Sequence, residues 1–321
     1  MIPKIVPIAG DASFRKFYRI VLNKKSKIIV FATKEKYKNL IIYSIINNFL
    51  RTKKILTPKL YAQNYKKGLI VVEDFGDLSY YKILLKQKEK LPTYKKLVDL
   101  LLKIQSIKPK TKISFLKKNY IMKKYSIKYL KKESDLFFDW YLSFFYKKKK
   151  ILCMKKKMNK ILISLYKKLN FPNICFVHRD FHVQNLIRVK KGIGVIDTQD
   201  ALIGNPSYDL VSLIDDVRIK TSKKLKKKIL DYYLTKMPKV YRFSKKNFIE
   251  DFNILSVQRS LKIIGIFARL LKRDKKNKYF KLIPYTWQIL ESRINSNIFA
   301  DLKHILDLNI KKNIRRKVLH K

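Results

Sequence analysis

The sequence predicts an α+β fold with two lobes, a small β-rich N-terminal lobe and a larger helical C-terminal lobe. Runs of β-branched and aromatic residues concentrate in residues 1–72, where they predict strands. Apolar residues recur at spacings of three and four over most of the remaining chain, which predicts amphipathic helices. A segment of short apolar runs and polar loops, residues 173–209, interrupts these helices. We therefore expect an N-terminal lobe at residues 1–76 and a C-terminal lobe at residues 77–321.

The N-terminal lobe is expected to hold a small antiparallel sheet and one helix. The runs YRIVL at 18–22 and KIIVFAT at 27–33 are separated by the polar NKKS, which predicts a hairpin. A helical pattern extends over about 38–53, and Pro58 makes its continuation unfavourable. GLIVVEDF at 68–75 predicts a further strand.

Helical spacing covers residues 79 to about 170 and returns over 208–321. No apolar run approaches the ~20 residues that cross a bilayer, so we expect no membrane insertion. The N-terminal residues show no pattern typical of a signal peptide, and a cytoplasmic protein is expected. The sequence indicates no oligomeric state.

The formal net charge of +53 raises the question of nucleic-acid binding, because Lys and Arg that neutralise phosphates release counterions. Gly and Pro are scarce while Lys, Ile, Asn, Tyr and Phe are abundant, as in proteins encoded by AT-rich DNA. The basic runs are also scattered beside helical patterns. We interpret the charge as solvated surface and expect no specific nucleic-acid partner. The two cysteines show no spacing typical of zinc sites or disulfide frameworks.

Two motifs carry the candidate chemistry, HRDFHVQN at 178–185 and GVIDTQD at 194–200. In the pattern H-R-D-x-x-x-x-N of phosphoryl transfer, the Asp accepts the proton of the acceptor hydroxyl and the Asn binds a metal ion. These residues are Asp180 and Asn185. Asp197 follows a strand-like run, where a turn can present a second carboxylate to the metal. The spacing therefore favours phosphoryl transfer.

A rival interpretation takes His178, Asp180 and His182 as ligands of a hydrolytic metal site. It would also have to recruit Asp197, and it leaves Asn185 without a role. We therefore regard it as the weaker interpretation.

Four stretches of the chain resemble the aminoglycoside phosphotransferase and choline kinase superfamily, whose fold resembles that of protein kinases. Within that superfamily they are most similar to the bacterial N-acetylmuramate and N-acetylglucosamine 1-kinases. The stretches are residues 10–20, 177–187, 194–218 and 258–284. The first and last are not general kinase features, and together the four span nearly the whole chain.

The resemblance implies a kinase that uses ATP and Mg²⁺. It implies that Asp180 is the base and that Asn185 and Asp197 bind Mg²⁺. His182 is assigned either to the substrate or to packing and hydrogen bonding within the catalytic loop. The residues implied for the nucleotide are Gly10, Asp11, Ala12, Ser13 and Arg15 over the phosphates, and Glu73, Asp74 and Phe75 at the adenine hinge. The remaining residues assigned to the substrate are Asp200, Arg259 and Arg269.

The chain departs from the kinase pattern at two points. Protein kinases place a Lys in the third strand and a Glu partner on the next helix, but residues 31–33 and 43–50 contain neither. Thr198 also stands where an aromatic residue is expected after the metal-binding Asp. The candidates for the missing phosphate cation are Arg15, Lys34 and, as a weaker choice, Arg19.

The expected reaction is transfer of the ATP γ-phosphate to a sugar, at the anomeric hydroxyl of N-acetylmuramate or N-acetylglucosamine in cell-wall recycling. A kinase for an aminoglycoside, choline or a hexose is an alternative, as is a basic binding protein that has lost activity. Cationic acceptors are disfavoured, because the whole chain is strongly positive and residues 208–321 contain few acids. The joint presence of Asp180, Asn185 and Asp197 argues against lost activity.

Overall fold

A computed structural model of the chain describes residues 4–8, 15–23, 25–33, 37–238 and 244–318. The chain divides into two compact units. The first unit contains Met1–Lys123 and Phe176–Ile203, and the second contains Lys124–Cys175 and Gly204–Lys321. This division by compactness does not follow the lobe boundary expected after residue 76. Residues 176–203, which contain both candidate motifs, belong to the same unit as the sheet.

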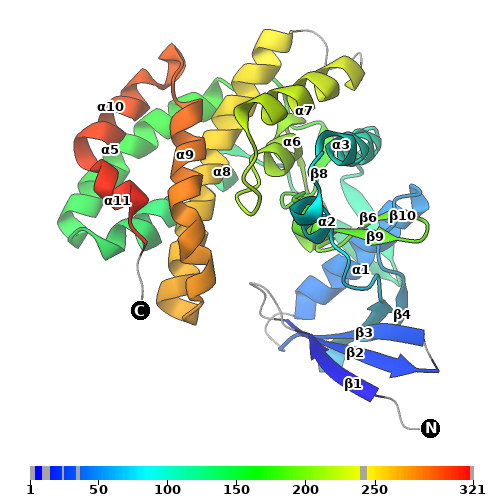
Figure 1. Ribbon diagram of the computed structural model, residues 1–321. Helices are drawn as coiled ribbons and strands as arrows, with labels where there is room; N and C mark the ends of the chain where they lie inside the picture. Colours follow the sequence, from blue (N-terminus) through cyan, green and yellow to red (C-terminus); the bar gives the residue numbers. More distant parts are fainter. Residues whose placement is uncertain (1–3, 9–14, 24, 34–36, 239–243, 319–321) are drawn as a thin grey trace. The chain divides into compact units, whose positions relative to one another are not determined.

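A five-stranded antiparallel sheet forms the N-terminal part of the first unit, in the order β1-β2-β3-β5-β4 (Figure 1). The hairpin and the later strand expected from the sequence are confirmed as β2, β3 and β5. In β2 and β3, Tyr18 pairs with Ile29 and Arg19 with Ile28. The strands are β1 (Lys4–Ile8), β2 (Lys16–Leu22), β3 (Lys25–Phe31), β4 (Leu60–Asn64) and β5 (Leu69–Glu73).

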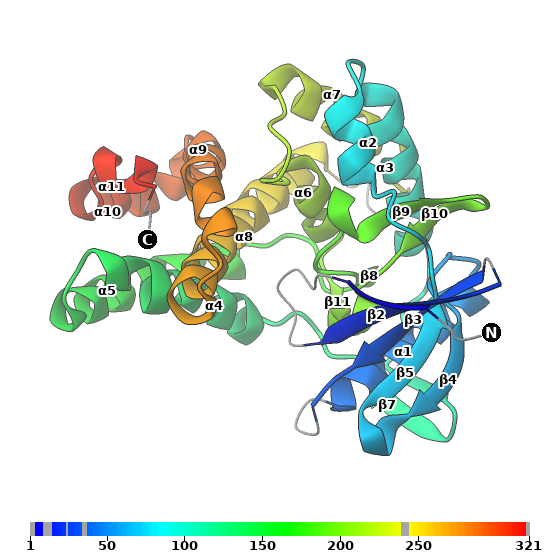
Figure 2. The ribbon, with the colours of Figure 1, turned by 60° about the horizontal axis from the view of Figure 1, so that its bottom comes forward.

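Helix α1 (Tyr37–Thr52) covers one face of this sheet, as Figure 2 shows. Leu40 and Tyr43 of α1 are buried against Val30 and Val72 of the sheet. Burying such side chains stabilises the fold by roughly 1.5–3 kcal/mol each. The helix expected at about residues 38–53 is therefore confirmed, and packing fixes its position on the strands.

The rest of the first unit contains short elements, several of which lie within the segment 176–203. Backbone hydrogen bonds from Arg188 to Leu78 (2.8 Å) and from Val195 to Leu56 (2.8 Å) join that segment to the N-terminal part of the chain. The elements are α2 (Tyr80–Lys86), α3 (Leu91–Gln105), β6 (Lys112–Phe115), β7 (Lys118–Ile121), β9 (Leu186–Val189) and β10 (Gly192–Val195), with short helices at Tyr65–Lys67, Val183–Asn185 and Thr198–Asp200. Strands β8 (Cys175–Val177) and β11 (Leu202–Gly204) lie where the chain passes from one unit to the other.

The β6–β7 hairpin lies inside a stretch for which the sequence predicted only helices, and that expectation was wrong. Leu116 and Lys117 form its turn with positive φ angles of 48° and 56°. Two-residue hairpin turns of this kind usually contain Asn and Gly, whose absence removes the sequence signal.

The second unit is helical, as expected, with α8 (Lys245–Asp274) packed against α4, α6 and α9. A Cβ added at Gly265 would lie 2.3 Å from the carbonyl carbon of Leu136, so only glycine permits this close crossing. Among the residues that the structure describes, no helix is long and apolar enough to span a membrane. The other helices are α4 (Ile127–Leu136), α5 (Lys148–Lys167), α6 (Ser207–Ile214), α7 (Lys223–Lys236), α9 (Ile283–Arg293), α10 (Ala300–Asn309) and α11 (Lys312–Arg316), with short turns at Phe137–Tyr141, Leu142–Phe144, Asn277–Leu282 and Asn297–Phe299.

Candidate active site

The backbone of the HRD motif is shaped by the His178 ring. The backbone N–H of Asp180 donates to Nδ1 of His178 (3.3 Å), so the ring proton lies on Nε2 and is donated to the carbonyl of Ile196 (2.9 Å). Arg179 adopts a φ of 74°, which is uncommon for a residue with a side chain. These contacts link the Asp180 loop to the residue that precedes Asp197.

Asn185 is held by the same loop. Its Nδ2 donates to the carbonyl of Asp180 (3.0 Å) and lies 3.5 Å from Nε2 of His182. The backbone N–H of Ile196 donates to the carbonyl of Asn185 (3.1 Å). The side chain of Asn185 makes these contacts through Nδ2 alone, and within the described ranges its Oδ1 has no hydrogen-bond donor.

Asp197 follows β10 in a left-handed conformation, with φ of 65° and ψ of 42°. Its Oδ1 accepts from Nη2 of Arg15 (2.6 Å) and from Nε2 of Gln199 (3.0 Å). Arg15 also donates through Nη1 to Oε1 of Gln199 (3.0 Å), which closes a triangle of polar contacts. The Asp197 side chain remains 39% exposed, and no described residue donates to its Oδ2.

Oδ1 of Asn185 and Oδ2 of Asp197 are the kind of oxygen ligand that Mg²⁺ prefers, so the residues present suit this ion. The rival site of His178, Asp180 and His182 is not supported. Over the described residues, no group of three or more His, Cys, Asp or Glu side chains is arranged to hold a metal. Both ring nitrogens of His178 are moreover engaged by the backbone.

Arg15 is enclosed by aromatic rings. Its guanidinium carbon lies 5.6 Å from the centre of the Phe17 ring and 5.9 Å from that of Tyr43, within the range of cation–π attraction. Burial raises the pKa of Tyr43 to about 12, so this residue is a neutral wall of the site. The loop residues Gly10, Asp11, Ala12 and Ser13, and the alternative cation Lys34, lie outside the described residues.

Arg19, the third candidate for the phosphate cation, is engaged elsewhere. It donates to both oxygens of Asp74 (2.6 and 3.1 Å) and to both oxygens of Asp77 (2.7 and 2.9 Å). Hydrogen bonds to Asp77 and Asp74 raise the pKa of Arg19, and the same contact lowers the pKa of Asp77. Arg19 therefore ties β2 to the segment after β5, while Arg15 meets Asp197.

The expected hinge, Glu73 to Phe75, lies at the end of β5. The backbone N–H of Glu73 donates to the carbonyl of Lys59 (2.8 Å), so this group is already used within the protein. A Cβ added at Gly194 would lie 2.5 Å from the Phe75 ring, which places the hinge directly against β10. Phe75 thus adjoins the strand that leads to Asp197.

Comparison with known proteins decides the family. The sequence model described as the phosphotransferase enzyme family (APH) matches residues 4–243. The chain belongs to the phosphotransferase enzyme family. The expected enzyme class, a phosphotransferase that uses an alcohol group as acceptor, and the two-lobed α+β fold class are thereby confirmed.

Two curated relatives are similar over most of this phosphotransferase, and both are named N-acetylmuramate/N-acetylglucosamine kinase. The protein of Caulobacter vibrioides is 28% identical over 84% of this chain and 74% of its own length. The protein of Pseudomonas aeruginosa is 26% identical over 91% of this chain and 84% of its own length.

Solved structures share the fold at low sequence identity. The aminoglycoside phosphotransferase APH(2'')-Ib with bound ADP gives a TM-score of 0.61 at 15% identity and covers 92% of this chain and 94% of that one. The ethanolamine kinase of Plasmodium vivax gives 0.63 at 14% identity, with coverage of 93% and 84%. These similarities concern the fold alone.

The four residues assigned to the substrate of this phosphotransferase differ in accessibility. In the first unit, His182 is only 6% exposed and lies against Asn185, which favours the hydrogen-bonding alternative, whereas the Asp200 side chain is 60% exposed. In the second unit, Arg259 is 3% exposed, with its guanidinium carbon 5.7 Å from the centre of the Tyr208 ring. Arg269 is half-buried, and burial lowers its pKa.

Sequence reasoning missed two contacts of this phosphotransferase. Gln199 joins Arg15 to Asp197, and its position two residues after Asp197 was the only available signal. Thr198 donates through Oγ1 to Oδ1 of Asn47 (2.7 Å), and both side chains are buried. The unusual Thr at position 198 was evident from the sequence, but its partner was not.

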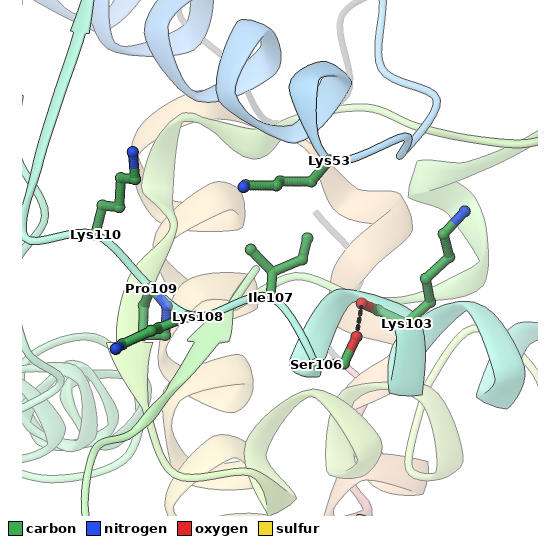
Figure 3. A pocket seen from close by; sticks show the side chains of 7 residues that line it. All are labelled: Lys53, Lys103, Ser106, Ile107, Lys108, Pro109 and Lys110. Carbon is green, nitrogen blue, oxygen red and sulfur yellow. Dashed lines mark hydrogen bonds between the residues drawn. The ribbon is translucent and has the colours of Figure 1, made fainter.

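A cavity of about 620 Å³ also lies within the first unit (Figure 3). Lys103 in its wall donates to the carbonyl of Lys54 (2.9 Å), and Ser106 donates to the carbonyl of Lys103 (2.8 Å). Its lining contains no carboxylate or imidazole and no residue of the candidate active site, so it offers no acid–base chemistry. It is lined by Lys53, Lys103, Ser106, Ile107, Lys108, Pro109 and Lys110.

Proposed function

We propose that this phosphotransferase transfers the γ-phosphate of ATP to a sugar hydroxyl, and that the acceptor is the anomeric hydroxyl of N-acetylmuramate or N-acetylglucosamine. The main support for phosphoryl transfer is the set of hydrogen bonds that connects the two motifs. Asn185 donates to the carbonyl of Asp180 and accepts from the backbone of Ile196, next to Asp197. Hydrogen bonds therefore connect the segment of the proposed base with the segments of both proposed metal ligands.

Each residue has a role that follows from its chemistry. Asp180 accepts the proton of the acceptor hydroxyl, late in a loose transition state. Asn185 and Asp197 would hold Mg²⁺, which supplies positive charge to the phosphate oxygens when bound. Arg15 is the proposed cation for the nucleotide phosphates, because its guanidinium already lies at Asp197 and replaces the missing third-strand Lys.

The proposed hinge follows from the position of β5. Glu73, Asp74 and Phe75 would line the adenine, with Phe75 packed on Gly194 of β10. Since the backbone N–H of Glu73 is engaged by Lys59, we propose that adenine meets backbone groups further along, at Asp74 or Phe75. The undescribed residues Gly10 to Ser13 would cover the phosphates, as the resemblance implies.

The amino-sugar acceptor is supported by the printed names of the relatives and by charge. With a net charge of +53, the chain would repel a cationic acceptor such as an aminoglycoside or choline. N-acetylmuramate carries a lactyl carboxylate, which an arginine can bind through two parallel hydrogen bonds. Arg269 is the better candidate for this contact, because Arg259 is almost completely buried. Asp200 would accept from sugar hydroxyls.

An anomeric hydroxyl is more acidic than other sugar hydroxyls, so a carboxylate base removes its proton more easily. The test is an ATP-consumption assay against amino sugars, hexoses, choline and aminoglycosides, followed by phosphorus NMR of the product. We expect consumption with N-acetylmuramate or N-acetylglucosamine, and a phosphorus signal coupled to the anomeric proton. A phosphate on C3 or C6 would overturn the anomeric assignment. Turnover of choline alone would overturn the proposal that the acceptor is a sugar.

A further inference from the structure

We propose that α1 positions Asp197 through a buried hydrogen bond between Asn47 and Thr198, in place of the Lys–Glu pair of other kinases. The proposal rests on the function proposed above, in which Asp197 is a Mg²⁺ ligand. It assigns a role to Asn47 of α1, and it explains why Thr stands at position 198. Both residues are positioning residues, because they act through Asp197.

The hydrogen bond joins two distant segments inside the first unit. Oγ1 of Thr198 donates to Oδ1 of Asn47 at 2.7 Å, and the two residues are 0% and 3% exposed. A buried hydrogen bond is costly to lose, because the remaining partner is left without water or a substitute. A phenylalanine at position 198 would carry no donor, so this contact depends on the hydroxyl of Thr198.

Asn47 is itself fixed in place. The hydroxyl of Thr57 donates to the carbonyl of Asn47 (2.8 Å), and α1 is packed on the sheet through Leu40 and Tyr43. The Asn47 side chain also contacts that of Tyr43, one turn earlier on α1. The acceptor of the Thr198 hydroxyl is therefore held by its own helix.

α1 reaches the metal-ligand segment from two successive turns. Tyr43 and Asn47 are four residues apart and share one helix face. The Tyr43 ring lies 5.9 Å from the guanidinium carbon of Arg15, whose Nη2 is 2.6 Å from Oδ1 of Asp197. The helix thus supports the side chain of Asp197 through Arg15, and its backbone through Thr198. Arg15 needs no acidic partner on α1, because Asp197 already pairs with it.

The backbone of Asp197 requires such support. Its φ of 65° is unfavourable for a residue with a side chain, and strained residues persist only where their surroundings hold them. The hydrogen bond on the very next residue supplies this restraint. Without it, we expect the carboxylate to lose its orientation toward the metal, although Arg15 would still neutralise it.

The test compares Thr198→Val and Asn47→Leu with the wild type by calorimetric titration of Mg²⁺ with a non-hydrolysable ATP analogue. We expect each variant to weaken Mg²⁺-dependent binding about tenfold, as the loss of one buried hydrogen bond predicts, and the double variant to be no weaker than either. Thr198→Ser keeps the hydroxyl and should stay within about twofold of the wild type. Binding of the analogue without Mg²⁺ should be unchanged.

Thr286→Val is the matched control for stability. Thr286 is also 0% exposed, and its hydroxyl bonds to the carbonyl of Leu282 in the second unit. If Thr198→Val lowers the melting temperature as this control does, yet leaves Mg²⁺ binding at the wild-type level, the hydrogen bond is only structural and the inference is overturned. If Thr198→Val does not fold, the smaller Thr198→Ala and the independent Asn47→Leu carry the same comparison.

Asp197→Ala separates this inference from the proposed function. Mg²⁺-dependent binding that survives Asp197→Ala would overturn the metal-ligand role and, with it, the proposed mechanism. If Asp197→Ala abolishes that binding while Thr198→Val and Asn47→Leu retain it, only the role of α1 is overturned.

Discussion

Nη2 of Arg15 lies 2.6 Å from Oδ1 of Asp197, and this ion pair joins the start of β2 to the end of β10. The Arg15 side chain is 11% exposed and that of Asp197 is 39% exposed, so the pair opens to solvent on the side of the carboxylate. An arginine in this place presents a planar set of donors, two of which already contact Asp197 and Gln199. It is thus a fixed cation at the carboxylate to which we assign the metal.

Arg15→Lys should reduce activity sharply, although it keeps the charge, because a lysine lacks the planar pair of nitrogens with which Arg15 contacts Asp197 and Gln199. We expect a loss of ~10²–10³-fold in kcat, the range seen when one donor to a developing charge is removed. Steady-state kinetics with varied ATP would measure it. Lys227→Gln removes a positive charge from a side chain that is 76% exposed, and it should retain wild-type kinetics. Wild-type kinetics of Arg15→Lys would show that only the charge at this position matters. A loss in Lys227→Gln as large as that in Arg15→Lys would show that the effect is not specific to position 15.

Asp180→Asn should lower turnover by ~10²–10⁴-fold, the usual contribution of a general base. Nucleotide binding should persist, because the backbone contacts of position 180 to His178 and Asn185 do not involve the carboxylate. Turnover is measured with the best acceptor, and affinity for the ATP analogue by calorimetry. A wild-type rate in this variant would show that Asp180 is not the base.

Gly194→Ala should disturb the hinge, because the added Cβ would lie 2.5 Å from the Phe75 ring. We expect a loss of about 1–3 kcal/mol in the free energy of unfolding, typical of overpacking, and weaker nucleotide binding. Denaturant unfolding and calorimetry measure the two effects. The double variant Gly194→Ala with Phe75→Leu should recover part of both, and additive losses would argue against this contact.

Because of Asp215, the second unit should become less stable at acidic pH. Burial alone would raise its pKa, but Arg293 (3.0 Å) and Lys226 (2.8 Å) outweigh burial and hold the pKa well below its usual range. A carboxyl group whose pKa is lower in the folded protein stabilises the fold at pH values above its unfolded pKa of ~3.9. This contribution is lost as the pH falls toward the pKa of the folded protein.

Asp215→Asn removes both the charge and this titration. It should destabilise the protein by about 3–5 kcal/mol near neutral pH, because two partly buried cations lose the buried carboxylate that pairs with them. Its free energy of unfolding should then vary less than that of the wild type below about pH 4. Denaturant unfolding at a series of pH values measures both effects, and parallel pH profiles would contradict the assignment.

Local patterns predicted most of the elements. The hairpin β2–β3, the helix α1 and the strand β5 all follow from spacings of two or 3.6 residues, which any short window of sequence contains. The β6–β7 hairpin escaped prediction, because its turn uses Leu116 and Lys117 in a conformation that these residues rarely adopt. Backbone strain of this kind depends on the surrounding structure and has no local signature.

By itself, the sequence determined the reaction class and the candidates for base and metal ligands, because Asp180, Asn185 and Asp197 lie within 18 positions in a recognisable order. Only the tertiary structure decided which cation meets Asp197 and what supports it. Arg15 is separated from Asp197 by 182 positions, and Asn47 from Thr198 by 151. Arg15 and Arg19 lie on the same short segment, yet one meets Asp197 and the other meets Asp74 and Asp77. That choice depends on strand register and on the packing of α1 against the sheet, which arise only when the whole unit has folded.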